Sequence, residues 1–352
     1  MLRLLLIFLL LPLSAEASLY YQGETSLYQD TVWEGDVLID GILTVAAGTT
    51  LEIRPGTRVR FTRYDSNADQ IGEHEIFIQG RLIARGTAAE PIIFTSAEAD
   101  PRPGDWGAIN MVMSEENANL LEYCRVEYAY RGFHAHFARV ELYHSRFRYN
   151  QRAAQFQESD VLLDDCRFEN NFNGLQFRDS TVKLLRSRIL NNNWGIRAVY
   201  VKLRLEDSLI AGNRINGVSL RDSEFFLLNN QLSGNRRGLY LQRSRGEARG
   251  NLISGNLEHG IYLEDSLADL ISNRIVDNGR AGIKVRDAGG EVVNNQLRAN
   301  HQFTLVNDGE DDFKVAENWY AASPRILDHN TRPTVGRITI AAPLQTPVVA
   351  PQ

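Results

Sequence analysis

Residues 210–235 read IAGNRINGVSLRDSEFFLLNNQLSGN, and residues 232–256 repeat the pattern as LSGNRRGLYLQRSRGEARGNLISGN. Both stretches hold an apolar residue three positions before an asparagine, and a glycine follows that asparagine after three or four positions. The pattern extends outward in both directions, with intervals of 21 or 22 residues between successive asparagines. These asparagines are Asn150, Asn171, Asn192, Asn213, Asn235, Asn256, Asn278 and Asn300.

Two further columns keep the same period. A glycine recurs at 132, 174, 195, 217, 238, 260 and 282, with Ala153 in the gap. Three columns with one period indicate stacked repeats, in which each repeat contacts its neighbours. The apolar column that precedes the asparagines is Phe147, Phe168, Ile189, Ile210, Leu232, Ile253, Ile275 and Leu297.

Each repeat is expected to contain three short strands. After Gly217, Val218 and Leu220 take alternate positions, which is typical of a half-buried strand. An Asp222-Ser223 turn and a second alternating strand follow, and a third strand carries the apolar residue before the next asparagine. This pattern leaves no room for a helix. The sequence predicts an all-β chain, a single right-handed parallel β-helix with three-strand coils of about 21–22 residues, an internal Asn ladder and capped ends.

Other repeat architectures fit less well. A leucine-rich repeat shares the period and an asparagine, but its L-x-x-L-x-L run is missing. A left-handed hexapeptide helix would repeat in multiples of six, and the calcium-binding nonapeptide pattern does not occur in the sequence.

Stacking the coils about 4.8 Å apart would place equivalent residues in straight columns. An inward asparagine can then bond its neighbours above and below and satisfy the buried backbone of the turn. A second small polar column includes Cys124 and Cys166, which lie two coils, or roughly 9–10 Å, apart. Because a disulfide needs Cα atoms within about 7 Å, we expect two buried free thiols. This column is Cys124, Ser145, Cys166, Ser187, Ser208, Asn230, Asn251, Asn273 and Asn295.

The first residues predict export. Arg3 precedes an apolar run that is too short to span a bilayer, and Ala15-Glu16-Ala17 supplies small residues for a signal peptidase. We therefore expect a cleaved signal peptide over residues 1–17, a secreted or periplasmic mature protein and no transmembrane segment. The formal net charge of −6 shows no basic excess of the kind that attracts nucleic acid, so no nucleic-acid partner is expected.

The opening coils are less regular than the later ones. Short apolar strands near residues 37–61 are predicted to be separated by turns at Asp40-Gly41, Ala47-Gly48 and Pro55-Gly56. We assign 18–31 to an N-terminal cap, 32–118 to irregular opening coils with two loop insertions, 119–318 to regular coils, 319–342 to a C-terminal cap and 343–352 to a flexible tail.

Both ends of the chain resemble a known group. The stretches GILTVAAGTTLEIRPGTRVRF, IQGRLIARGTAAEPIIFTS and GDWGAI resemble the opening turns of bacterial right-handed β-helix repeat proteins of the pectate-lyase-like superfamily. The stretch ENWYAASPRILDHNTRPTVGRITIAAP resembles their closing segment. The resemblance implies a β-helix over nearly the whole mature chain. It implies no particular function, because the superfamily holds lyases, hydrolases, epimerases and proteins without an assigned activity.

Two insertions, Thr62–Glu75 and Ser96–Asp105, follow the same strand in consecutive coils and should touch. Their carboxylates are compatible with a calcium or sugar site or with solvated acidic loops. We favour solvated loops because no D-x-D-x-D-G spacing occurs, so no cofactor is expected beyond this unsupported calcium site. The His, Met and Cys residues do not cluster at ligand spacing apart from His134 and His136, which could bind a metal only if a third ligand approached, so no metal site is expected.

One strand face is predicted to present two outward columns rich in Arg, Gln and Tyr. Arginine pairs with carboxylates or sulfates, glutamine bonds hydroxyl groups and tyrosine stacks on sugar rings. The alternative is a solvated sheet face, which uses the same residue types. The candidate glycan-binding residues are His134, His136, Gln155, Gln176, Arg178, Arg197, Arg221, Tyr240, Tyr262, Lys284 and Arg286.

Catalysis has weaker support in the sequence. A lyase needs a base and a cation beside a uronate carboxyl group, and His134, His136, Arg178 and Arg197 could be given those roles. A glycoside hydrolase needs paired carboxylates, and the predicted face offers only Glu264. No catalytic residue is assigned. The leading hypothesis is an exported, non-catalytic protein that binds a polysaccharide or cell-surface glycan. A polysaccharide lyase or epimerase acting on uronate-containing glycan is the second, and a structural surface or assembly protein is the third.

Overall fold

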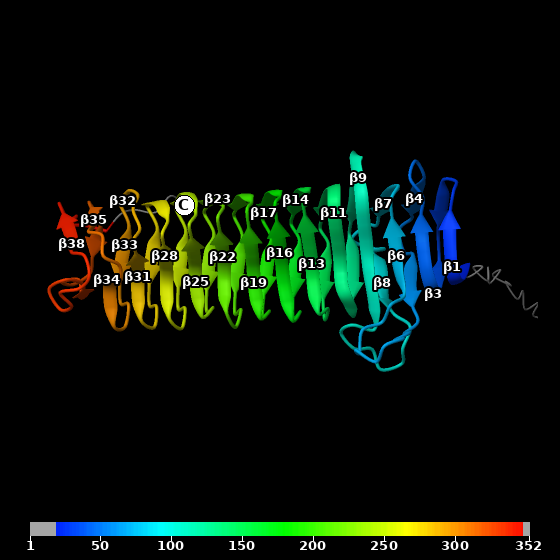
Figure 1. Ribbon diagram of the computed structural model, residues 1–352, viewed down its shortest axis with the longest axis horizontal. Coiled ribbons are helices and arrows are strands. Elements are labelled where there is room, and N and C mark those ends of the chain that lie inside the picture. The colour runs from blue at the N-terminus through cyan, green and yellow to red at the C-terminus, as the bar shows by residue number, and fades with distance from the viewer. Residues whose placement is uncertain (1–18, 348–352) are drawn as a thin grey trace, which may run out of the picture.

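The chain forms one long right-handed parallel β-helix (Figure 1). The computed structural model describes residues 19–347, so the predicted signal peptide at 1–17 lies outside the described residues. Thirty-six strands form one sheet, and a second sheet of two strands lies near the C-terminal end. No α-helix occurs within residues 19–347, and hence no helix there is long and apolar enough to cross a membrane. The predicted fold class is confirmed.

Each regular coil contributes one strand to each of three faces. Face A, which carries the predicted columns, consists of parallel strands paired coil to coil. Its regular strands are β13 (Arg152–Gln157), β16 (Asn173–Arg178), β19 (Trp194–Val199), β22 (Asn216–Arg221), β25 (Arg237–Gln242), β28 (His259–Glu264), β31 (Ala281–Arg286), β34 (Phe303–Asn307) and β37 (Ile326–Leu327).

Faces B and C follow face A in chain order within each coil. Face B consists of β14 (Asp160–Asp164), β17 (Thr181–Leu185), β20 (Lys202–Glu206), β23 (Glu224–Leu228), β26 (Arg245–Arg249), β29 (Leu267–Ile271) and β32 (Val292–Val293). Face C consists of β10 (Cys124–Glu127), β12 (Arg146–Arg148), β15 (Arg167–Glu169), β18 (Arg188–Leu190), β21 (Leu209–Ala211), β24 (Gln231–Ser233), β27 (Leu252–Ser254), β30 (Arg274–Val276), β33 (Gln296–Arg298) and β36 (Trp319–Tyr320).

The opening coils use longer strands that bend around corners. Strands β1 (Leu19–Leu27) and β3 (Asp36–Val45) run from face C to face A, and β9 (Trp106–Glu122) and β11 (Ala129–Tyr143) run from face A to face B. The shorter strands are β2 (Thr31–Trp33), β4 (Thr50–Ile53) and β7 (Arg81–Arg85) on face B, β6 (Glu75–Ile78) on face A, and β5 (Arg58–Phe61) and β8 (Ile92–Ser96) on face C.

At the predicted Asp40-Gly41 turn the chain does change from face C to face A, but inside one strand and not between two. Strand β3 passes through both residues without a break, and Gly41 lies directly beside Gly23 of β1. A Cβ atom on Gly41 would lie 1.9 Å from the carbonyl oxygen of Gly23, so the glycine serves close backbone approach. The glycines of the other two predicted turns, Gly48 and Gly56, both have a φ of +78° as their turns require.

The predicted Asn ladder is present along the turn between faces C and A. Asn192 shows the pattern, since its backbone N–H and its Nδ2 both donate to Oδ1 of Asn213, at 3.0 and 3.2 Å. Its Nδ2 also donates to the carbonyl oxygen of Phe168 at 3.1 Å. The same contacts link every consecutive pair from Asn150 to Asn300. The ladder therefore satisfies the buried backbone of one turn in every coil.

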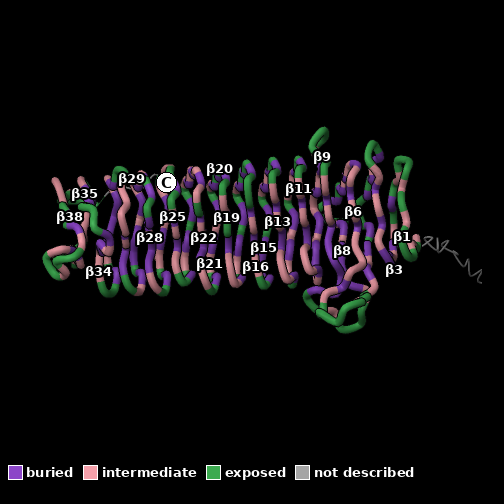
Figure 2. Tube along the Cα trace, viewed as in Figure 1, coloured by how far each residue is buried: buried purple, intermediate pink, exposed green. Residues whose placement is uncertain are grey.

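The other two turns of the coil carry ladders of their own. The predicted Cys/Ser/Asn column lies in the turn between faces B and C and extends one step further, to Asn318. A third, unpredicted column of buried serines follows the turn between faces A and B. In all three turns the residue before the inward one has a positive φ, as at Arg186, Asn191 and Tyr200. Figure 2 shows the resulting alternation of buried and exposed residues along the coils.

Both cysteines are buried and free, as predicted. Burial raises the pKa of the Cys166 thiol to about 12 and raises that of Cys124 further. We expect a thiol reagent to label neither cysteine in the folded protein and both after denaturation, because the reactive thiolate is absent and access is blocked. A native disulfide, or labelling without unfolding, would contradict the placement of these residues in the ladder.

The two insertions, 62–75 and 96–105, touch as predicted and form the lobe beside β8 in Figure 1. The backbone N–H of Gly72 donates to the carbonyl oxygen of Gly104 at 2.7 Å, and the N–H of Arg63 donates to Glu98 at 3.0 Å. At the C-terminal end, β35 (Phe313–Ala316) pairs with β38 (Ile338–Ala341). Beyond them, Leu344 bridges to Trp319.

Candidate functional site

Face A carries the two outward columns that the sequence predicts. Strand pairing places Gln155 beside Gln176, and Gln176 beside Arg197. The first column is His134, Gln155, Gln176, Arg197, Ser219, Tyr240, Tyr262 and Lys284. The second is His136, Gln157, Arg178, Val199, Arg221, Gln242, Glu264 and Arg286.

Glycine in the second position of the face A strands from β16 to β31 allows the Asn ladder to pack beneath it. A Cβ atom on Gly217 would lie 2.8 Å from both the Nδ2 of Asn235 and the carbonyl oxygen of Gly238. Because the ladder fixes these backbones coil by coil, the outward side chains of face A lie at regular intervals of about 4.8 Å.

A groove of about 380 Å³ lies in the middle of face A. It crosses β13, β16, β19 and β22, and five of the candidate residues lie along it. The outward side chains that line it are Gln155, Gln157, Gln176, Arg178, Arg197, Val199 and Arg221, together with Tyr200 in the adjoining turn. The remaining candidates lie at the two ends of the face.

The arginines of the groove are largely free to meet a ligand. The guanidinium of Arg197 lies 5.5 Å from the ring centre of Trp194 and forms no ion pair with a carboxylate of residues 19–347. Arg178 and Arg221 contact their neighbours Asp179 and Asp222 at 3.0 and 3.6 Å, but their side chains remain 64% and 47% exposed. Exposed pairs of this kind contribute about 0–1 kcal/mol, so an anionic ligand could compete with them.

The C-terminal end of face A neutralises its own charges. The carboxylate of Glu264, only 7% exposed, accepts a hydrogen bond from the Tyr240 hydroxyl and pairs with Arg286. Lys284 lies 2.8 Å from Asp308. Burial raises the pKa of Tyr240 and of Tyr262, whose ring centres lie 5.2 Å apart. Four of the candidate residues therefore already contact one another or a neighbouring carboxylate, namely Tyr240, Tyr262, Lys284 and Arg286.

The N-terminal end of face A holds a hydrogen-bonded chain of three residues. Nδ2 of Asn110 donates to Glu75 at 3.2 Å, and Oδ1 of Asn110 lies 2.9 Å from Nδ1 of His134. Since a carbonyl oxygen can only accept, Nδ1 carries the proton and Nε2 of His134 keeps its lone pair. Burial raises the pKa of Glu75 to about 6, and burial with nearby Arg131 lowers the pKa of His134 to about 4. The neighbouring His136 contacts Glu158.

Sequence reasoning missed Glu75 and Asn110 as parts of this face. The column runs from Phe77 to Asn110 to His134, with steps of 33 and 24 residues. The insertion 96–105 lengthens the first step, and extra residues between Ser114 and Asn119, where the register shifts, lengthen the second. A repeat of 21 or 22 residues cannot align such positions. The prediction that Glu264 is the only carboxylate on this face is therefore wrong, because Glu75 also lies on it.

The acidic side chains of the two insertions bond to the loops themselves. Asp65 accepts from the backbone N–H groups of Asp69 and Gln70, and Asp105 accepts from the Ser96 hydroxyl and the N–H of Arg102. Across residues 19–347, no group of three or more His, Cys, Asp or Glu side chains could hold a metal ion.

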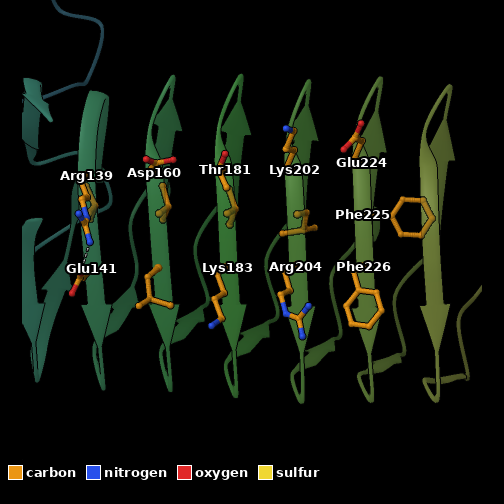
Figure 3. A pocket seen from close by; sticks show the side chains of 15 residues that line it. Arg139, Glu141, Asp160, Thr181, Lys183, Lys202, Arg204, Glu224, Phe225 and Phe226 are labelled. Atoms are coloured by element: carbon orange, nitrogen blue, oxygen red, sulfur yellow. Dashed lines mark ion pairs between the residues drawn. The ribbon is translucent and has the colours of Figure 1, made fainter.

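Face B holds a second groove, of about 630 Å³, that the sequence does not predict (Figure 3). Its two outward rows cross β11, β14, β17, β20 and β23. Arg139 and Glu141 form an ion pair at 3.6 Å, and the guanidinium of Arg204 lies 4.8 Å from the ring centre of Phe226. Four basic and three acidic side chains line this groove, so face B carries a smaller excess of positive charge than the face A groove, which is lined by arginine without a carboxylate. It offers a matched control surface for face A.

Three family models match successive parts of the chain. Residues 25–127 match a pectate-lyase-like β-helix domain, and residues 105–225 match a right-handed β-helix region. Residues 201–324 match a model described as the periplasmic copper-binding protein NosD. Copper belongs to the description of that model, and among residues 19–347 no group of three or more His, Cys, Asp or Glu side chains could hold a metal ion.

Several solved structures are similar to this chain, and no curated protein matches it. A double mutant of the periplasmic alginate epimerase AlgG aligns at 14% identity over 88% of this chain and 76% of that chain, with a TM-score of 0.50. The A-module of the Azotobacter vinelandii mannuronan C-5 epimerase AlgE6 aligns at 11% identity over 85% and 91%, with a TM-score of 0.48. At 14% identity the likeness to AlgG shows the fold alone. The chain is a right-handed parallel β-helix, and residues 25–127 and 105–225 are similar to β-helix models, the first of them pectate-lyase-like, a resemblance that assigns no activity.

Proposed function

We propose that this chain is an exported, non-catalytic protein that binds an elongated anionic glycan along face A. The observation that carries the proposal is the groove across β13, β16, β19 and β22, where Arg197 has no carboxylate partner among residues 19–347. Guanidinium groups match the geometry of carboxylates and sulfates, and the amides of Gln155, Gln157 and Gln176 can bond sugar hydroxyls. Four coils span roughly 14 Å, so a repeating glycan would meet side chains at regular intervals.

Two observations support export. Residues 1–17 have the charge, apolar core and small residues of a cleavable signal peptide. The NosD model and the AlgG structure are both described as periplasmic proteins. A periplasmic or extracellular location would bring face A into contact with cell-surface or environmental polysaccharides.

A lyase or epimerase that acts on a uronate-containing glycan is the second candidate function. It is favoured by the chain Glu75–Asn110–His134, which leaves Nε2 of His134 as a neutral proton acceptor on face A. Abstraction of the proton beside a uronate carboxylate needs such a base and a cation near the carboxylate. Arg131 and Arg152 supply positive charge beside His134.

A screen of the purified mature protein against polyuronates, sulfated glycans and neutral glycans tests the proposal. We expect retention on an anionic glycan, weakening with added salt because the exposed arginines are screened within about 8 Å at physiological ionic strength. Lack of retention on every anionic glycan would overturn binding. A rise in ultraviolet absorbance from unsaturated uronate, lost in His134→Gln but kept in the His144→Gln control, would favour the lyase instead.

A further inference from the structure

Two arginines at the N-terminal end of face A share one aromatic ring. Arg131 and Arg152 are direct neighbours in the pairing of β11 with β13. Their guanidinium carbons lie 5.0 and 5.2 Å from the ring centre of Tyr130. Neither forms an ion pair with a carboxylate in the described part of the chain. Two like charges are therefore held side by side, and the carboxylate that acts on Arg131 from nearby, that of Glu75, forms no ion pair with it.

The hydrogen-bonding capacity of this pair is also incompletely used. Nε of Arg131 is buried and has no hydrogen-bond partner among residues 19–347. Arg152 donates to Oε1 of Gln155 at 3.1 Å, and Gln155 also lines the groove of face A. A buried donor without a partner is rare in folded proteins and can mark the place of an absent ion or ligand. The pair thus lies at the end of the groove with unused donors and unbalanced charge.

We propose that Arg131 and Arg152 form a subsite for an oxyanion, the carboxylate or sulfate of a glycan unit, whose binding draws a proton onto His134. This inference rests on the proposed function in one respect, since it treats the subsite as the end of the face A groove. An oxyanion can accept hydrogen bonds from both guanidinium forks and neutralise their charge.

The groups around His134 determine the direction of the coupling. Glu75 and Asn110 lie on β6 and β9, Arg131 and His136 on β11, Arg152 on β13, and Glu158 contacts His136. Without an anion, burial and the positive charge of Arg131 keep the pKa of His134 near 4. A bound anion favours the imidazolium form and disfavours ionised Glu75, whose pKa is about 6, so it raises the pKa of both groups. The complex then binds more protons than the free protein, and affinity increases as pH falls.

The pKa of His134 in the full mature protein, followed by nuclear magnetic resonance, tests the subsite directly. We expect inorganic sulfate or galacturonate to raise it by about one unit in the wild type, which corresponds to about tenfold tighter binding of the protonated form. Separate titrations with the two anions distinguish a sulfate subsite from a carboxylate subsite. The double variant Arg131→Gln/Arg152→Gln should show no rise, whereas Arg188→Gln, which removes an exposed arginine of face C, should behave as the wild type.

The outcomes separate this inference from the proposed function. If neither anion moves the pKa of His134 in the wild type, the subsite is wrong, even where a glycan binds the groove. If the pKa rises with sulfate or galacturonate while no polysaccharide is retained, the subsite stands and the proposed function fails. Arg131→Lys keeps the positive charge but loses the planar guanidinium fork. We expect this variant to lose most of the anion-induced rise in the pKa of His134, which would show recognition by geometry and not a general effect of charge.

Discussion

Replacing Asn213 by alanine is expected to lower the free energy of unfolding by about 4 kcal/mol. Oδ1 of Asn213 accepts from the N–H and the Nδ2 of Asn192, and its Nδ2 donates to Asn235 and to the carbonyl oxygen of Ile189. The substitution removes four buried hydrogen bonds and leaves donors and acceptors that water cannot reach. Each buried group left without a partner costs about 1–3 kcal/mol, which makes the total large against a typical stability of about 5–15 kcal/mol.

Urea unfolding followed by circular dichroism measures this effect. Asn193→Ala is the matched control, because Asn193 follows the ladder residue Asn192 in the sequence but its own side chain is outside the ladder. For this control we expect the free energy of unfolding to change by no more than about 0.5 kcal/mol. Asn213→Ser keeps a small polar group, as the neighbouring ladder does at Ser187 and Ser208, and should lie between the two. Equal stabilities for Asn213→Ala and Asn193→Ala would show that the ladder does not hold the coils together.

The double variant Arg178→Ala/Arg197→Ala is expected to weaken binding of the retained anionic glycan by about 100-fold. Each charge-assisted hydrogen bond contributes about 1.5 kcal/mol, so the loss of two amounts to about 3 kcal/mol. Both arginines lie in the groove and are exposed, so the fold should remain intact. Isothermal titration calorimetry with an oligosaccharide of the retained glycan measures the change.

The double variant Lys183→Ala/Arg204→Ala is the control on face B. It removes two positive charges from the same two coils, since β16 and β17 belong to one coil and β19 and β20 to the next. General attraction between the protein and a polyanion would be reduced equally by both double variants. We expect the affinity of the face B variant to lie within about twofold of the wild type, because only long-range attraction is lost in it. Equal losses in the two variants would contradict recognition by face A.

The repeat predicted the fold and most of the register because equivalent side chains of successive coils stack on one another, so their residue types recur with the period of the coil. A residue such as Asn213 can fill its position only if Asn192 and Asn235 lie one coil away on either side. The same logic placed Cys124 and Cys166 two coils apart and aligned Gln176 with Arg197. Period and residue type were sufficient for these positions.

Other features left no such signal. Many of the residues with positive φ before the ladder positions are aspartate, asparagine or glycine, which favour that conformation, but Arg186 and Tyr200 adopt it without such a preference. Extra residues lengthen the coils that hold Glu75 and Asn110, so these two residues do not follow the repeat of 21 or 22 residues. Their hydrogen-bonded chain to His134 could therefore not be predicted from the sequence period. The pairing of Tyr240 and Arg286 with Glu264 also depends on side-chain direction, which the period does not specify.

A crystal structure of the protein with the oligosaccharide that it retains most strongly tests the central claim most directly. The account predicts sugar units along face A across β13, β16, β19 and β22, with an anionic group within hydrogen-bonding distance of Arg197. An oligosaccharide seated in the face B groove between Arg139 and Phe226, with face A empty, would contradict it.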